Sequence, residues 1–267
     1  MITKNRLYVE LTKNQVQTFL NEDSILVFPM GATEQHGPHL PINTDTILAK
    51  GFANRIMLEY ADKYDLWLLP CFEYSLSPEH KWASGTISIS IELFVNLIKE
   101  LINSLVVSQP ARNMMIVNGH GGNRGVLETL IQEIRNEYSF TIAVIHPSSL
   151  AKVSSNSRLC EVHAGKSETS MIMELAPELI EYDNIPKDIC ESQKANGNKF
   201  ITDRGVTWPW NSNDSIFSCD GVIGDCSEAS RDLGKLIVDS SVRNTEEVLM
   251  NLKEYGKVIR NKERKEI

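Results

Sequence analysis

Short apolar runs alternate along the chain with longer segments in which apolar residues recur at helical spacing. A short apolar run bounded by turn residues predicts a buried strand, and the helical spacing predicts an amphipathic helix. Strands are expected at Ile25–Phe28, Leu66–Leu69, Met114–Val117 and Thr141–Ile145, with Thr86–Ser90 as a further strand or a sheet edge. Helices are expected from Thr12 to about Leu20, from Asp45 to about Tyr60, over Ile91–Ser108, Gly125–Arg135 and Glu168–Leu175, and from Ser227 to about Tyr255.

This alternation predicts the fold class. Strands joined through helices usually run parallel, with helices covering both faces of the sheet. We therefore predict an α/β fold, a three-layer α/β/α sandwich with a largely parallel central sheet. The length of 267 residues and the hydrophobic content of 42% suit a single domain over residues 1–267, with a charged tail from Lys257 that frays.

The stretch from Pro186 to Cys219 shows no clear period and contains Trp208-Pro209-Trp210. A long irregular segment in a compact domain is usually functional or an interface. The two tryptophans would cover a pocket or pack between subunits, and the sequence does not separate these roles.

Composition narrows the class of protein. A net charge of −8 argues against nucleic acid and anionic membranes as partners. No apolar run is long enough to span a bilayer, and the first residues lack the apolar core of a signal peptide. The five cysteines are scattered, so we expect reduced thiols in a cytoplasmic protein and no sulfur-ligated zinc; a Cys219–Cys226 disulfide is disfavoured.

The densest chemistry follows the first strand, where Glu34, His36 and Asp45 lie in or beside a stiff Gly- and Pro-containing loop. Carboxylates with imidazole suit Zn²⁺, Mn²⁺ or Fe²⁺. In extended backbone Glu34 and His36 would face the same way. The alternative is a solvated surface pair, which two further motifs make less favourable.

The second motif, Asn118-Gly-His120-Gly-Gly-Asn123, follows another apolar strand. Ligands of open α/β sheets bind beyond the carboxyl ends of strands, where His120 would lie. A phosphate-binding loop is the alternative, but the Lys-Ser/Thr pair of a P-loop is missing. In the third motif, His163 comes shortly before Glu168, and Glu168 lies in the first turn of a predicted helix. The alternative for Glu168 is that it only caps this helix.

Together these motifs resemble the creatininase (creatinine amidohydrolase) family. Two further segments, Ser77-Pro-Glu79-His80 leading to Gly85-Thr-Ile-Ser88 and Gly221-Val-Ile-Gly224-Asp225, also fit, and the resemblance runs from about Leu11 to Gly234. It implies two divalent metal ions (Zn, Mn or Fe) held by Glu34, His36, Asp45 and His120, with Asp45 as the bridge. It also implies that His163 shuttles a proton; the alternative is that His163 only orients a ligand.

The chain departs from the creatinine-hydrolysing pattern at two positions. Gly122 and Val162 stand where those members carry glutamate. Glu168 then becomes the natural fifth ligand, and creatinine becomes a less favoured substrate. Ser77 and Asn123 are expected to contact substrate, His39 to be a buried hydrogen-bonding residue, and Glu79 and His80 to hold their loop rather than line the pocket mouth.

The resemblance thus predicts a metal-dependent amidohydrolase that cleaves a C–N amide bond, such as a cyclic amide or formamide, in a small molecule. The alternatives are a peptidase-like enzyme acting on a short modified peptide and a non-catalytic metal-binding member of the fold. Family members also lead us to expect a homo-oligomer, specifically a hexamer.

Overall fold

The computed structural model describes all residues except 1–5, 154–160, 188–200, 202–205, 217 and 267. Four strands form one parallel sheet in the order β2-β1-β3-β4. The strands are β1 (Ile25–Met30), β2 (Leu66–Leu68), β3 (Asn113–Asn118) and β4 (Thr141–Ile145). Each was predicted within one or two residues of its observed bounds.

The helices form the outer layers. They are α1 (Lys13–Phe19), α2 (Thr44–Tyr64), α3 (Ile91–Ser108), α4 (Arg124–Glu137), α5 (Pro147–Leu150), α6 (Lys166–Leu175) and α8 (Arg231–Glu266). Short 3₁₀ turns lie at Tyr8–Glu10, Pro78–His80, Gly121–Asn123, Pro177–Leu179 and Tyr182–Asn184. No helix in the described part of the chain combines the length and apolar character that crossing a membrane requires.

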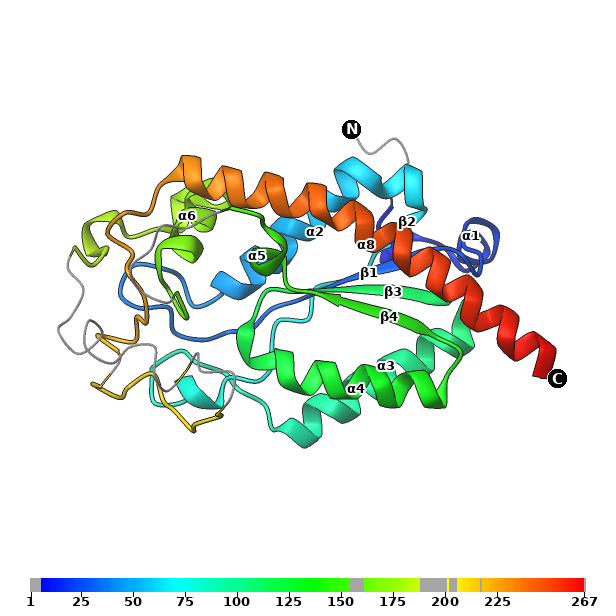
Figure 1. Cartoon of the computed structure of the whole chain (residues 1–267), viewed down its shortest axis with the longest axis horizontal. Coiled ribbons are helices and arrows are strands. Elements are labelled where there is room, and N and C mark those ends of the chain that lie inside the picture. Colours follow the sequence, from blue (N-terminus) through cyan, green and yellow to red (C-terminus); the bar gives the residue numbers. More distant parts are fainter. Residues whose placement is uncertain (1–5, 154–160, 188–200, 202–205, 217, 267) are drawn as a thin grey trace.

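The alternation of side chains along β1 explains the two cores. Successive strand residues point to opposite faces, so Ile25 and Val27 pack with α2, α6 and α8, whereas Leu26 and Phe28 pack with α3 and α4. Both faces of the sheet are therefore buried, and Figure 1 shows α8 and α2 on one side of it and α3 and α4 on the other. The predicted α/β/α sandwich with a parallel sheet is confirmed.

Two predicted elements were wrong. Thr86–Ser90 is not a strand; only Ile87 forms an isolated bridge, to Thr33. Its serines make local bonds instead, since Ser88 Oγ accepts from the Ser77 N–H and Ser90 caps α3. The last helix continues past its predicted end near Tyr255, because Ile259 is buried and Arg260 hydrogen-bonds Asn113 and Asp23, and α8 runs to Glu266.

The cysteine prediction was partly wrong. Cys71 and Cys226 are free thiols, so there is no Cys219–Cys226 bridge. Cys219, however, is disulfide-bonded. Cys160 and Cys190 lie outside the described residues. Sequence spacing gave no sign of this bond, because bonded cysteines need only be close in space.

Candidate functional site

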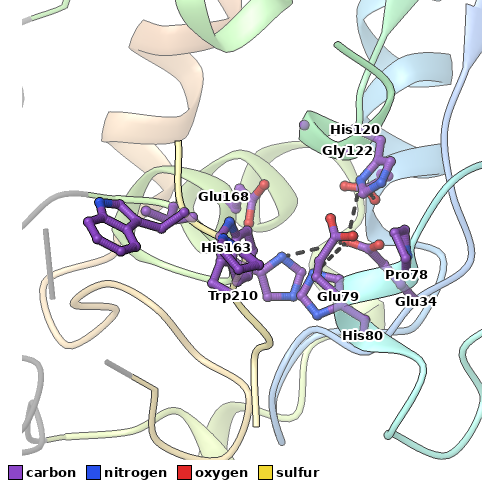
Figure 2. A pocket seen from close by; sticks show the side chains of 14 residues that line it. Glu34, Pro78, Glu79, His80, His120, Gly122, His163, Glu168 and Trp210 are labelled. Atoms are coloured by element: carbon purple, nitrogen blue, oxygen red, sulfur yellow. Dashed lines mark ion pairs between the residues drawn. The ribbon is translucent and has the colours of Figure 1, made fainter. Parts of the chain in front are cut away.

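The loops after β1 and β3 meet at a pocket of about 490 Å³. The two strands are parallel neighbours, so these loops leave the same edge of the sheet side by side. The pocket lining combines acidic and imidazole side chains with the apolar segment Trp208-Pro209-Trp210 (Figure 2). The site therefore lies where ligands bind in open parallel sheets.

Glu34 is the most deeply enclosed of these acids. Its side chain is about 1% exposed, and neither carboxylate oxygen has a hydrogen-bond partner among the residues that the structure describes. Three imidazole nitrogens surround Oε1: His120 Nδ1 at 3.3 Å, His80 Nε2 at 3.5 Å and His163 Nδ1 at 3.6 Å (Figure 2). Burial raises the pKa of Glu34. A buried carboxylate that lacks hydrogen bonds is costly, so this position calls for a cation.

Asp45 lies in the first turn of α2, between two histidines. Its Oδ1 is 3.3 Å from His36 Nε2, and its Oδ2 is 2.9 Å from His120 Nδ1. Burial alone would raise the pKa of Asp45, but His120 and His36 outweigh burial and hold that pKa well below its usual range. Burial likewise lowers the pKa of His36, yet the Asp45 carboxylate outweighs it and raises the pKa to about 9. Asp45 thus offers one oxygen to each side of the site.

Glu168 enters from α6, on the opposite wall. Its Oε2 accepts the Ala164 N–H at 2.6 Å, and burial raises its pKa to about 7. Position 122 could not take over this role, because a β-carbon there would overlap the His120 ring and lie 2.9 Å from the Leu76 carbonyl oxygen. The crowding around Gly122 is the physical reason why a carboxylate has to come from elsewhere.

Backbone carbonyls orient the histidines. His36 Nδ1 lies 3.1 Å from the Glu34 carbonyl oxygen, and His120 Nε2 lies 2.5 Å from that of Leu76. A carbonyl can only accept, so each of these ring nitrogens carries the proton. The opposite nitrogens, His36 Nε2 and His120 Nδ1, face the carboxylates, which favour a proton on them, and each offers a lone pair to a metal ion once that proton is lost. Imidazoles that ligate metals are usually held in this way.

This donor set fits divalent metal ions. Glu34, Asp45 and His120 offer ligand atoms within 4.8 Å of one another, and so do His36, His163 and Glu168. Mixed oxygen and nitrogen donors suit Zn²⁺, Mn²⁺ or Fe²⁺. The partnerless oxygens of Glu34 are the observation that supports the fit, because direct ligation would satisfy them. The structure thus brings the five predicted metal ligands together, beside His163.

The two predicted substrate contacts lie elsewhere. Ser77 and Asn123 are fully buried and are not among the described residues that line the pocket. Asn123 Oδ1 accepts from the Leu76 N–H at 3.3 Å, and its Nδ2 donates to Asn118 at 3.2 Å, so this side chain braces the second loop. Contact of either residue with substrate stays a prediction.

Glu79 and His80 line the pocket, although they were predicted to hold their loop rather than line the pocket mouth. His80 is the more informative of the two. This side chain lines the pocket and stacks on His163, with ring centroids 4.1 Å apart and planes at 28°. Burial lowers the pKa of His80 to about 3 and holds the pKa of His163 well below its ordinary value. Only its place beside Glu79 in a family-like motif could have drawn attention to it. His39, by contrast, is buried and hydrogen-bonded to Thr169, as expected.

Comparison with known proteins gives a consistent result. The family model described as creatinine amidohydrolase matches residues 9–249. The chain is 35% identical over 160 residues to the mycofactocin precursor peptide peptidase of Mycobacterium tuberculosis, which covers 57% of this chain and 59% of that protein. It is 29% identical over 155 residues to the 2-amino-5-formylamino-6-ribosylaminopyrimidin-4(3H)-one 5'-monophosphate deformylase of Methanobrevibacter ruminantium, covering 57% and 58%. It is 24% identical over 183 residues to the creatinine amidohydrolase of Pseudomonas putida, covering 61% and 68%. The matched region thus spans about three fifths of the peptidase relative.

Two solved structures share the fold. A manganese form of creatininase has a TM-score of 0.71 and 22% identity, covering 94% of this chain and 99% of that one. A creatininase variant of Zn–Zn type has a TM-score of 0.70 and 21% identity, covering 95% and 99%.

Proposed function

The chain belongs to the creatininase (creatinine amidohydrolase) family, and on that premise we propose that it is a metal-dependent amidohydrolase that cleaves a C–N amide bond in a small molecule. The observation that carries the proposal is the buried Glu34 carboxylate. Neither of its oxygens has a hydrogen-bond partner in the described part of the chain, and it lies within reach of His120 and Asp45 in a pocket open to a ligand.

Two divalent metal ions would account for all five ligand side chains. Glu34, Asp45 and His120 would hold one ion, and His36, Asp45 and Glu168 the other, because Asp45 presents one oxygen to each histidine. When bound, such ions bring the pKa of water to about 7 and polarise a carbonyl oxygen.

His163 supplies the proton transfer in this proposal. Its Nε2 lies 2.7 Å from the Gln35 carbonyl oxygen, so Nε2 carries the proton and Nδ1 presents a lone pair towards Glu34. At rest His163 is neutral, because its pKa lies well below the ordinary value. It would therefore first take a proton from the attacking water and then give it to the leaving nitrogen. A C–O bond forms, the C–N bond breaks, and the proton returns to the product amine.

The substrate is an amide other than creatinine. Creatinine-hydrolysing members carry glutamate where this chain has Gly122 and Val162, and position 122 has no room for a side chain. A formamide or cyclic amide is the first candidate, in line with the deformylase relative. A short modified peptide is the second candidate, and the 35% identity to a precursor peptide peptidase favours it.

Metal analysis coupled to a substrate screen tests the proposal. We expect the purified protein to contain close to stoichiometric metal and, after loading with Zn²⁺, Mn²⁺ or Fe²⁺, to hydrolyse at least one member of a panel of formamides, lactams and short peptides. A protein that takes up metal but hydrolyses none of the panel would instead support the non-catalytic alternative. A protein that binds no metal would contradict the proposal outright.

A further inference from the structure

We propose that His80 is a neutral hydrogen-bond donor that points its Nε2–H into the pocket and binds the carbonyl oxygen of the substrate. This assignment makes His80 a substrate-binding residue instead of a loop support or a third imidazole ligand. The role given to His80 rests on the proposed hydrolytic function, but the orientation of its ring does not. The geometry follows from a chain of hydrogen bonds that begins at Gln35.

The orientation of the Gln35 amide is fixed by two backbone groups. The Gly37 N–H lies 2.8 Å from Oε1 and can only donate, so that atom must be the amide oxygen. The Gly221 carbonyl lies 3.1 Å from Nε2 and can only accept, so that atom must be the amide nitrogen. The two constraints agree, and Gln35 presents its second N–H to its nearest remaining neighbour, since Ser212 Oγ is farther away, at 3.4 Å.

That neighbour is His80. Its Nδ1 lies 2.9 Å from Gln35 Nε2 and must therefore accept a hydrogen bond. Ser212 Oγ receives the indole N–H of Trp82 at 2.7 Å, and its single hydroxyl proton has two acceptors within reach, His80 Nδ1 at 2.7 Å and the Glu79 carbonyl oxygen at 3.2 Å. The ring nitrogen is the nearer of the two. In a neutral imidazole one nitrogen accepts and the other carries the proton. His80 is thus the Nε2–H tautomer.

The donor end of this ring faces the centre of the site. Glu34 Oε1 lies 3.5 Å from His80 Nε2, a distance too long for a good hydrogen bond. His163 stacks on His80 and presents Nδ1 to the same oxygen at 3.6 Å (Figure 2). The two stacked rings thus present different groups to the pocket, because His163 offers a lone pair and His80 offers an N–H.

This division of roles suits amide hydrolysis. A lone pair is needed to remove a proton from water, and a fixed donor is needed where negative charge develops on the carbonyl oxygen. A tautomer held by Gln35 and Ser212 gives that donor without reorganisation. It also argues against His80 as a metal ligand, because ligation through Nε2 would require its proton to move to Nδ1, against the Gln35 N–H.

The tautomer can be read directly by NMR. Long-range ¹⁵N–¹H correlation spectra of histidine-labelled protein distinguish protonated from bare ring nitrogens, and the His80 signals are assigned as those missing in His80→Asn. We expect protonated Nε2 and bare Nδ1 on His80 in both the metal-free and the zinc-loaded protein. A proton on Nδ1 in either form overturns the proposal. Failure to bind zinc would refute the metal proposal alone, since the metal-free spectrum still decides the tautomer.

A matched pair of variants tests the donor. Asn at position 80 can still accept from Gln35 but does not reach the pocket, whereas Gln extends an amide N–H to roughly the position of Nε2. Inorganic phosphate, titrated into the zinc-loaded proteins, serves as an oxyanion probe. We expect His80→Asn to bind phosphate about tenfold more weakly than wild type, and His80→Gln to stay within about threefold. All three should carry equal zinc. Unchanged phosphate affinity in His80→Asn, or loss of zinc from it, would rule out the donor role.

Discussion

Gln35 connects the chemistry of the site to the backbone at the scale of single residues. Its carbonyl accepts from His163, and its side-chain amide donates to His80. One residue, placed between the proposed ligands Glu34 and His36, thereby sets the tautomers of two pocket histidines. A buried polar network destabilises a protein when some of its groups lack hydrogen-bond partners. Here the groups of the two histidine rings that face away from the pocket have such partners.

Glu168→Gln tests the fifth ligand. A neutral amide is a weaker metal ligand than a carboxylate, so we expect the variant to lose one of two metal ions and most activity. Elemental analysis of the purified variant measures the first effect. Glu178→Gln, an exposed acid beyond the same helix, is the control and should keep full metal content. Full occupancy and near-normal turnover in Glu168→Gln would leave Glu168 as no more than a helix-capping residue.

His163→Ala separates proton transfer from ligand orientation. We expect both metal ions and the fold to persist while kcat falls about 10²–10⁴-fold, the usual contribution of a positioned acid or base. The loss should shrink for a substrate whose leaving amine has a low pKa, because that amine departs without full protonation. Two substrates with different leaving groups provide the measurement. Equal rate losses together with lost metal would show that His163 orients a ligand instead.

At the scale of elements, two helices begin at the pocket and each carries a carboxylate in its first turn, Asp45 on α2 and Glu168 on α6. Anions are favoured at this end of a helix. The position of α6 depends in turn on α8, because Gly234 of α8 lies directly against the Ser170 carbonyl of α6 and a β-carbon at that position would overlap it.

Gly234→Ala should therefore destabilise the protein by about 1–3 kcal/mol, the usual cost of overpacking. Gly125→Ala is the matched control, because the residue is in α4 and, outside its own helix, no described atom lies within 4 Å of a β-carbon there. Removing a helical glycine should stabilise by up to about 1 kcal/mol. Urea unfolding of both variants measures the free energy of unfolding and shows whether each substitution lowers or raises it. A neutral Gly234→Ala would show that α6 and α8 separate easily.

At the scale of the whole molecule, the proposed ligands come from distant parts of the chain. The loops after β1 and β3 contribute three of them, and α2 and α6 contribute Asp45 and Glu168. Bound metal would therefore hold both the sheet and one helical layer together, so metal binding and global stability are linked.

Chelation should accordingly lower the thermal midpoint. Metal at about 100 times its dissociation constant stabilises by about 2.7 kcal/mol, which for a chain of this size is about 5–10 °C. Differential scanning calorimetry before and after treatment with a chelator measures the shift, and restored zinc should reverse it. An unchanged midpoint after verified removal of metal would contradict the linkage.

Metal binding should also strengthen as pH rises. In the metal-free site burial raises the pKa of Glu34 and brings that of Glu168 to about 7, while Asp45 raises that of His36 to about 9 against the opposing effect of burial. These groups must lose their protons to ligate, so the free protein holds more protons than the bound form and higher pH favours binding up to about pH 9. Calorimetric zinc titrations at pH 7, in buffers of different ionisation enthalpy, count the protons released. No release would contradict the pKa pattern.

The sequence by itself determined the parallel sheet, because buried strands and amphipathic helices leave period-specific patterns such as Ile25–Phe28 and Ile91–Ser108. It also drew attention to Glu34, His36, Asp45 and His120, which follow strand ends or open a helix, whereas Glu168 as a fifth ligand came from the resemblance to the creatininase family. Thr86–Ser90 was wrongly predicted as a strand, because its alternating serines make local hydrogen bonds and the segment does not pair as a strand of the sheet.

Only the tertiary structure decided how the site is completed. The crowding at Gly122 comes from Leu76 and His120, and the tautomer of His80 comes from Gln35 and Ser212. Ser212 is distant in sequence from the ring that it contacts, so no local pattern could reveal the pair. Ring polarity depends on which donors and acceptors surround each nitrogen, and that arrangement exists only once the chain has folded.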